Sequence, residues 1–267
     1  MQPGAGRAVG SPVWVLAWVL ALLSSACMPS APDPQPVTVR VEGEVGSERL
    51  AGYQQLGEQA VVEVEQLWGP GALTHPVRLV IAADDAEFAR LTGHPPQEQQ
   101  VPAVTVGSGR RAHVVAHPSA WDRLGAEGRQ AVVTHEVTHL AMQGDGPAPA
   151  WLGEGLAEYT AHRDSPTPVA VIAGSALQPV RRGELPTGWP DPTGAVTMES
   201  GDRWGGYAMA WLACEFIASD HSEEQLIELY HRVAGGAQLA DAVPAVLEVT
   251  EQELLDAWGR WLADMSG

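Results

Sequence analysis

The sequence predicts an α+β protein with a small mixed or antiparallel sheet, a helix that carries two histidines four residues apart, and a helical C-terminal half. Short Val-rich runs, alternating or continuous, precede residue 120 and are typical of strands. Beyond residue 200, apolar residues recur at helical spacing behind Ser and Thr caps. No internal repeat or linker is visible, so we expect one domain over residues 37–267.

The N-terminal half of this domain is expected to combine strands with two helices. The predicted strands lie at 37–45, 77–82, 101–106 and 111–116. The predicted helices lie at 47–68 and 84–91. Asp84 is the expected N-cap of the second helix. Gly107-Ser108-Gly109 lies between the last two strands and predicts a hairpin there.

The C-terminal half is expected to be a long loop followed by helices. Residues 165–201 are rich in Pro, Gly and Thr, which predicts a loop. The helices predicted beyond it lie at 204–219, 222–234, 236–247 and 250–264. Ser222 and Thr250 are the expected N-caps, and Thr250 with Glu253 forms a capping box.

The most informative stretch of the chain is His135-Glu136-Val137-Thr138-His139. Its flanking residues are mostly Ala, Val and Leu, which predicts a buried helix that Gly144-Asp145-Gly146-Pro147 ends. Residues four apart lie on the same face of a helix, so His135 and His139 could bind one metal ion. Glu136 lies about 100° around the helix, where it could reach a water molecule on that ion without being a ligand.

A second helix, predicted after Pro149, supplies the candidate for a third ligand. Glu154 follows His139 by fifteen residues, in Trp151-Leu152-Gly153-Glu154-Gly155-Leu156-Ala157-Glu158-Tyr159. Catalytic zinc typically takes three protein ligands and leaves its fourth position to water. A tight turn between the two helices would bring Glu154 back to the histidines. Glu158, one turn further, could bond the outer nitrogen of a histidine ligand, or could simply be solvated.

Two other interpretations of the histidines are weaker. Two unrelated histidines on an exposed helix would have polar flanks, which this stretch lacks. His113 and His117 are also four residues apart, but they have no Cys or carboxylate close by in the sequence. Polar positions on the surface or in a cleft are therefore favoured for this pair over a second metal site.

The two motifs resemble those of the gluzincins, the zinc metallopeptidases whose third ligand is a Glu. The chain looks most like the small bacterial peptidase MA-like proteins, and aminopeptidases and leukotriene A4 hydrolase carry a similar W-L-N-E-G-F-A helix. The resemblance implies a thermolysin- or aminopeptidase-like catalytic domain over residues 37–264. It implies that His135, His139 and Glu154 bind one zinc ion, with Glu136 as general base and acid. It also implies that one of the strands at 101–106 and 111–116 pairs with the substrate backbone.

The family further suggests a tyrosine that donates to the oxyanion. Tyr207, in Gly205-Gly206-Tyr207-Ala208, is our candidate, against the alternative of an ordinary core tyrosine; Tyr159 is a weaker choice. Aminopeptidases of this clan also carry a G-x-M-E-N strand that captures the free amine of the substrate. This chain contains no Asn at all, which leaves an endopeptidase or an enzyme of unknown specificity.

The N-terminus and the composition predict an exported protein. Residues 1–27 resemble an export signal, with an apolar run of eleven residues that is too short to span a membrane. Ser24-Ser25-Ala26-Cys27 resembles a bacterial lipoprotein box in which Cys27 is lipidated, although Ser24 stands where Leu is usual. Cleavage and release is the competing interpretation. Residues 28–36 form a Pro-rich tether. Cys214, the only other cysteine, is expected to be a buried, inert thiol.

The net charge of −18, without a basic run, argues against nucleic acid as a partner and against attraction to anionic lipid. Contact with a membrane would then come only through the lipid at Cys27. The sequence therefore predicts zinc-dependent hydrolysis of a peptide or protein substrate by an exported, membrane-tethered endopeptidase. The alternative is a non-catalytic envelope protein that binds a partner or uses zinc structurally. Oligomeric state is not predicted.

Overall fold

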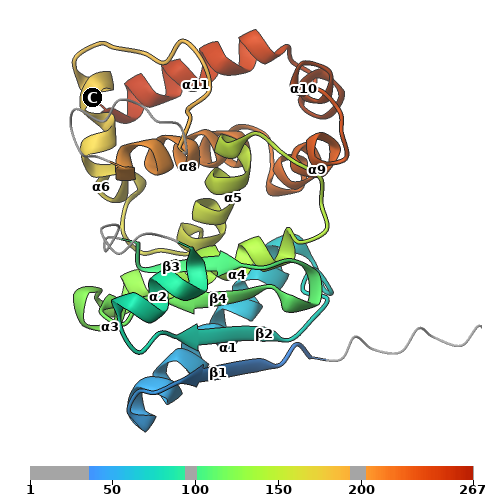
Figure 1. Cartoon of the computed structure of the whole chain (residues 1–267). Coiled ribbons are helices and arrows are strands. Elements are labelled where there is room, and N and C mark those ends of the chain that lie inside the picture. The colour runs from blue at the N-terminus through green and yellow to red at the C-terminus, as the bar shows by residue number, and fades with distance from the viewer. Residues whose placement is uncertain (1–35, 94–100, 193–202, 267) are drawn as a thin grey trace, which may run out of the picture. The chain divides into compact units, whose positions relative to one another are not determined.

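A four-stranded sheet forms one end of the folded chain, in the order β1-β2-β4-β3. In the computed structural model, which describes residues 36–93, 101–192 and 203–266, this sheet lies below most of the helices in Figure 1. The strands are β1 (Val39–Gly43), β2 (Val77–Ile81), β3 (Ala103–Val106) and β4 (His113–Ala116). β1, β2 and β4 run parallel, and β3 pairs with β4 in the antiparallel sense. The sheet is therefore mixed, and β3 is an edge strand next to the site described below.

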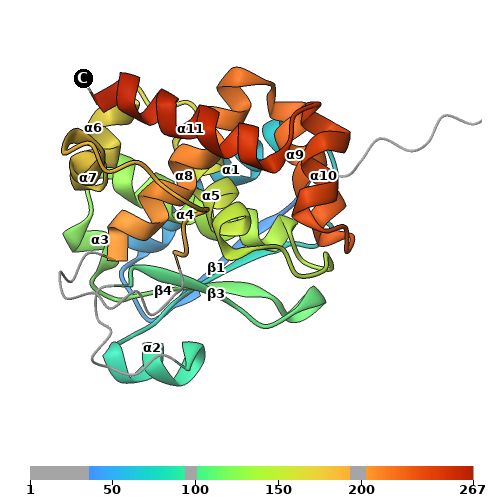
Figure 2. The same ribbon diagram turned by 90° about the horizontal axis from the view of Figure 1, so that it is seen from above.

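Helices cover both faces of the sheet because the strand side chains alternate between two apolar cores. On one face, the inward residues pack against α1 (Ser47–Trp68) and α4 (Ala126–Ala141). On the other face, α2 (Asp85–Thr92) packs through Phe88 against Val115. Figure 2 shows α2 on the opposite side of the sheet from the other helices. The carboxylate of Asp84 accepts a hydrogen bond from the backbone N–H of Glu87 at 2.8 Å, which confirms the predicted N-cap.

The C-terminal half forms a separate and larger apolar core around α5 (Ala150–His162) and α8 (Arg203–Asp220). Three further helices complete it: α9 (Glu223–Ala234), α10 (Leu239–Leu247) and α11 (Glu251–Ser266). Ser222 and Thr250 cap α9 and α11 as predicted. Cys214 is fully buried in this core, and burial raises the pKa of its thiol well above the ordinary value, which suits an inert side chain.

The expected loop at 165–201 was wrong in its first part. Three short helical segments fold there: α6 (Val169–Ala173), the 3₁₀ turn Gly174–Leu177 and α7 (Gln178–Arg181). Their small apolar residues, among them Leu177 and Val180, are buried against the helical core. Pro168 and Gly174 lie at the ends of α6. Such helix-breaking residues are visible in the sequence, whereas the packing that stabilises these short helices is not. Two other short segments, the 3₁₀ turn Gly109–Arg111 and α3 (Ala120–Arg123), were not predicted.

Several predictions concern residues outside the part that the structure describes. These are the export signal, Cys27, nearly all of the tether and residues 193–201 at the end of the predicted loop. Within residues 36–93, 101–192 and 203–266, no helix is both long and apolar enough to cross a bilayer.

Candidate metal centre

Helix α4 presents His135 and His139 side by side, as their spacing predicts. The two Nε2 atoms lie 3.1 Å apart, and the two rings meet edge to face. Val133 and Val137 of the same helix are buried against the sheet, which fixes the opposite face of α4. The histidines consequently face away from the sheet core, toward α5.

Helix α5 brings Glu154 to the same point. The chain leaves α4 through Gly144, which has a φ of 98°, and α5 begins directly after Pro149. One carboxylate oxygen of Glu154, Oε2, lies 3.4 Å from Nε2 of His135 and 3.4 Å from Nε2 of His139. Three ligand atoms from two helices thus converge, and the cluster His135, His139 and Glu154 could hold a metal ion.

Glu158 lies behind the cluster and faces two histidines. Its Oε1 is 3.1 Å from Nδ1 of His135, and its Oε2 is 3.4 Å from Nε2 of His162. The approach to Nδ1 is an ion-pair contact that deviates from the line of a good hydrogen bond. Glu158 is only 8 % exposed, so the alternative interpretation of Glu158 as a solvated surface carboxylate is wrong.

The charges in this cluster reinforce one another. Burial alone would lower the pKa of His135, but the carboxylates of Glu158, Glu154 and Glu136 outweigh it, and this pKa lies well above its ordinary value. Burial would raise the pKa of Glu158, but the imidazoles of His135 and His162 hold it down at about 2. His135 and His139 likewise outweigh burial at Glu154 and hold its pKa well below the usual range. The carboxylates of Glu154 and Glu158 are therefore ionised and could accompany a cation.

Glu136 lies next to the cluster and is hydrogen-bonded by a residue of the sheet. The hydroxyl of Thr105, on β3, lies 2.7 Å from Oε2 of Glu136 and 2.9 Å from its main-chain oxygen. Glu136 is 8 % exposed but lines the cleft described next. It is thus placed beside the three candidate ligands without belonging to them.

A cleft of about 830 Å³ opens over the cluster, large enough for a segment of peptide or a drug-sized ligand. β3 forms one wall through Ala103, Val104 and Thr105, and the N-terminal part of α4 forms another. Pro102, Leu124 and Val132 contribute apolar surface to its lining, and three carboxylates and three histidines line it as well.

Tyr207 lines this cleft from α8, and its ring lies 6.4 Å from the ring of His135. It is half-buried rather than enclosed in the core. Tyr159, the weaker candidate, is directed elsewhere: its hydroxyl donates to Oε1 of Glu223 at 2.8 Å. Of the two, Tyr207 is the one placed to reach a molecule in the cleft.

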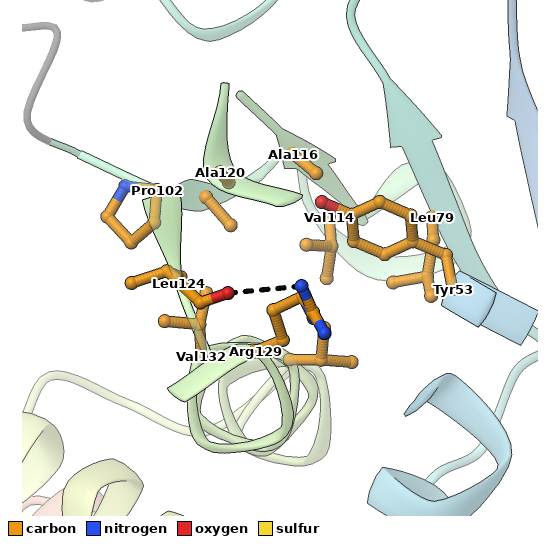
Figure 3. Close-up of a pocket in the computed structure, with 11 residues that line it drawn as sticks. Tyr53, Leu79, Pro102, Val114, Ala116, Ala120, Leu124, Arg129 and Val132 are labelled. Carbon is orange, nitrogen blue, oxygen red and sulfur yellow. Dashed lines mark hydrogen bonds between the residues drawn. The ribbon is translucent and has the colours of Figure 1, made fainter. Parts of the chain in front are cut away.

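Figure 3 shows a second, enclosed gap between the sheet and α4. Its volume of about 10 Å³ is at the lower limit for one water molecule. It shares Pro102, Leu124 and Val132 with the lining of the cleft. Arg129 closes it by donating to the main-chain oxygen of Leu124 at 3.0 Å. This gap is a packing feature behind the cleft and not a second site.

The contact between α5 and α8 fixes the position of Glu154, the third candidate ligand. A Cβ added to Gly155 would lie 2.4 Å from the main-chain oxygen of Ala210 and 2.8 Å from Sγ of Cys214. Only glycine permits this approach, because real Cβ atoms do not come so close to other heavy atoms. Gly155 directly follows Glu154, so the two helices are in contact immediately beside the ligand.

His113 and His117 lie outside the candidate cluster and face different partners. Nδ1 of His113 lies 2.9 Å from the main-chain oxygen of Arg111. His117 is buried, accepts the N–H of Ser119 at its Nδ1 and faces Asp85 through its Nε2. Among the residues that the structure describes, the only group of three potential ligands is the one on α4 and α5.

Sequence reasoning missed two residues of the site, Thr105 and His162. Thr105 is the only hydroxyl residue in β3, and strand alternation could have placed it on the same face as Ala103. His162 is one helical turn beyond Glu158, so the spacing rule that paired His135 with His139 would also have paired these two.

Comparison of the chain with protein-family models, with curated proteins and with solved structures returns no match. The functional assignment therefore depends on the site itself.

Proposed function

We propose that the chain is a zinc-dependent peptidase of the gluzincin type, and that it acts as an endopeptidase. The observation that carries this proposal is the convergence of His135, His139 and Glu154 at the floor of a peptide-sized cleft, with the carboxylate of Glu136 beside them. A thermolysin- or aminopeptidase-like domain is part of the proposal. The mixed sheet, the helix with the two histidines and the helix with the third ligand support it in that order along the chain.

The spacing of the three ligand atoms favours zinc. Ligand atoms about 2.0–2.1 Å from a tetrahedral zinc ion lie about 3.3–3.4 Å from one another. The corresponding separations here are 3.1, 3.4 and 3.4 Å. Two imidazoles with one carboxylate also form a common donor set of catalytic zinc. A structural zinc site would be closed by a fourth protein ligand, and among the described residues the cluster contains three.

Each residue of the site would then have a separate role in hydrolysis. A zinc ion at this site would polarise the scissile carbonyl and lower the pKa of a water molecule beside it. Glu136 would take a proton from this water as its oxygen bonds to the carbonyl carbon. When the C–N bond breaks, Glu136 would return that proton to the leaving amine and become a carboxylate again. Tyr207 would donate a hydrogen bond to the oxygen on which negative charge develops.

The substrate would bind as an extended segment along β3. This strand is at the edge of the sheet and forms a wall of the cleft, so a peptide could add to it by backbone hydrogen bonds. The apolar lining at Leu124 and Val132 suits an apolar side chain of that peptide. No Arg is among the lining residues in the described part of the chain, so the cleft offers no guanidinium there to bind a free C-terminal carboxylate. These features favour cleavage within a chain.

We further propose that the protein is exported and attached to the membrane by a lipid on Cys27, with cleavage and release as the alternative. This part of the proposal is supported by the sequence of residues 1–36.

The proposal is tested with the purified chain and a library of quenched fluorescent peptides, with and without EDTA. Cleavage should depend on zinc, and Glu136→Gln should keep one zinc per chain while hydrolysis falls at least about a hundredfold. Glu58→Gln, an exposed change on α1, is the matched control and should keep full activity. A Glu136→Gln protein that retains full activity would remove Glu136 from its role. A zinc-loaded wild-type protein that cleaves nothing would favour the non-catalytic alternative.

A further inference from the structure

The edge strand β3 and the candidate base are linked through one side chain, that of Thr105. Along β3, Val104 and Val106 pack toward α2, whereas Ala103 packs toward α4. Side chains alternate along a strand, so Thr105 shares the α4 face with Ala103. This places the hydroxyl of Thr105 against the turn of α4 that carries Glu136.

Two acceptors on Glu136 lie within reach of this hydroxyl. The Oγ1 atom is 2.7 Å from the carboxylate Oε2 and 2.9 Å from the main-chain oxygen. A hydroxyl has one proton to donate, and an ionised carboxylate is the stronger acceptor. The carboxylate Oε2 is therefore the preferred acceptor of this hydroxyl, and the main-chain oxygen lies close by as a second one.

We propose that Thr105 is a positioning residue for the base. Its hydroxyl, on the strand that lines the cleft, holds one carboxylate oxygen of Glu136 in place. The inference rests on the proposed hydrolytic function. With Oε2 held, Oε1 is the oxygen left to take a proton. Small misplacements of a catalytic group cost large factors in rate, so this anchor affects the turnover step rather than substrate binding. Thr105 itself touches no reacting atom.

A purely structural role would be to fasten β3 to α4. In that case, loss of the hydroxyl would weaken the fold and the cleft wall together, without a specific effect on turnover. The two roles are separated by comparing Thr105→Val, which keeps the shape but loses the hydroxyl, with Thr105→Ser, which keeps the hydroxyl. Thr160→Val is the matched control, because Thr160 also donates from a buried hydroxyl to a main-chain oxygen, that of Leu156.

Kinetics on the best-cleaved peptide of the library give the first readout. We expect Thr105→Val to lower kcat about ten- to a hundredfold with KM within twofold of wild type and one zinc per chain. Thr105→Ser should recover most of kcat. Thr160→Val should leave kcat within twofold, although it removes the acceptor of the Trp68 indole N–H. Unchanged kcat in Thr105→Val, or equal loss in Thr105→Ser, would overturn the inference while leaving the peptidase proposal intact.

Thermal unfolding of the EDTA-treated protein gives a readout without catalysis. Thr105→Val should lower Tm by about 3–6 °C in the wild-type background and by less than half of that shift when Glu136→Ala is already present. Equal shifts in the two backgrounds would show that Thr105 does not act through the Glu136 side chain. Should the wild-type protein bind zinc but cleave no peptide, the peptidase proposal would fail, and this coupling alone would decide whether Thr105 holds Glu136.

Discussion

Replacing Glu158 should weaken zinc binding in graded steps. Its Oε1 lies 3.1 Å from Nδ1 of His135, and the side chain is 11 % exposed, so water screens the pair poorly. Glu158→Gln keeps an oxygen there but removes the charge, which costs about 1–1.5 kcal/mol, or roughly tenfold in the Kd for zinc. Glu158→Ala removes the partner altogether and should raise this Kd by up to about a hundredfold.

Competition for zinc with a chromogenic chelator, at fixed pH, measures these affinities. Glu215→Gln is the matched control: it is a half-buried carboxylate on α8 whose pKa is raised by burial and by the charge of Glu223, not lowered by the histidines. It should leave the Kd for zinc unchanged. If the three variants bind zinc equally, or if Glu158→Gln binds it less tightly than Glu158→Ala, the assigned support of His135 by Glu158 is incorrect.

Three further outcomes are expected. Tyr207→Phe should lower kcat about ten- to a thousandfold without loss of zinc, measured by peptide hydrolysis; unchanged kcat would assign oxyanion stabilisation to another group. Gly155→Ala should destabilise the protein by about 1–3 kcal/mol in urea unfolding, because the added Cβ meets α8; a stable variant would contradict the close packing described above. In EDTA-treated protein, the raised pKa of His135 adds stability that is complete below about pH 6.5 and is lost as pH rises through the raised pKa. The lowered pKa of Glu154 adds stability that is complete above about pH 4.3 and is lost as pH falls through the lowered pKa. The contribution of the cluster to Tm should thus be largest between about pH 4.3 and 6.5, and a pH-independent difference in Tm between wild type and His135→Ala would refute it.

Local signals in the sequence were enough for the regular elements and for the three metal ligand candidates. The helix predicted at 47–68 has those bounds in the structure, because an apolar stripe and Gly69 define it. His135 and His139 follow from the helical repeat alone. Glu154 required one further assumption, that the turn after Gly144 folds α5 back onto α4, and Pro and Gly residues in that turn supported it.

Features that depend on long-range packing could not be predicted in the same way. The sequence did not show which strand is the edge, so it could not choose between the strands now seen as β3 and β4. The role of Thr105 depends on that order and on the side of β3 that faces α4. The short helices between 169 and 181 depend on burial against α8, and no local pattern of that length identifies a buried turn.

The close approach at Gly155 couples the position of α5, which carries Glu154, to that of α8. Glu154 cannot be shifted by redesigning its own helix alone, because the backbone of Ala210 already occupies the space into which α5 would have to move. Substitutions on the buried side of α8 would therefore change the position of Glu154, and with it the geometry and affinity of any ion bound by the candidate cluster. Redesign of the metal preference of such a site would therefore start with substitutions on α8 rather than with residues that line the cleft.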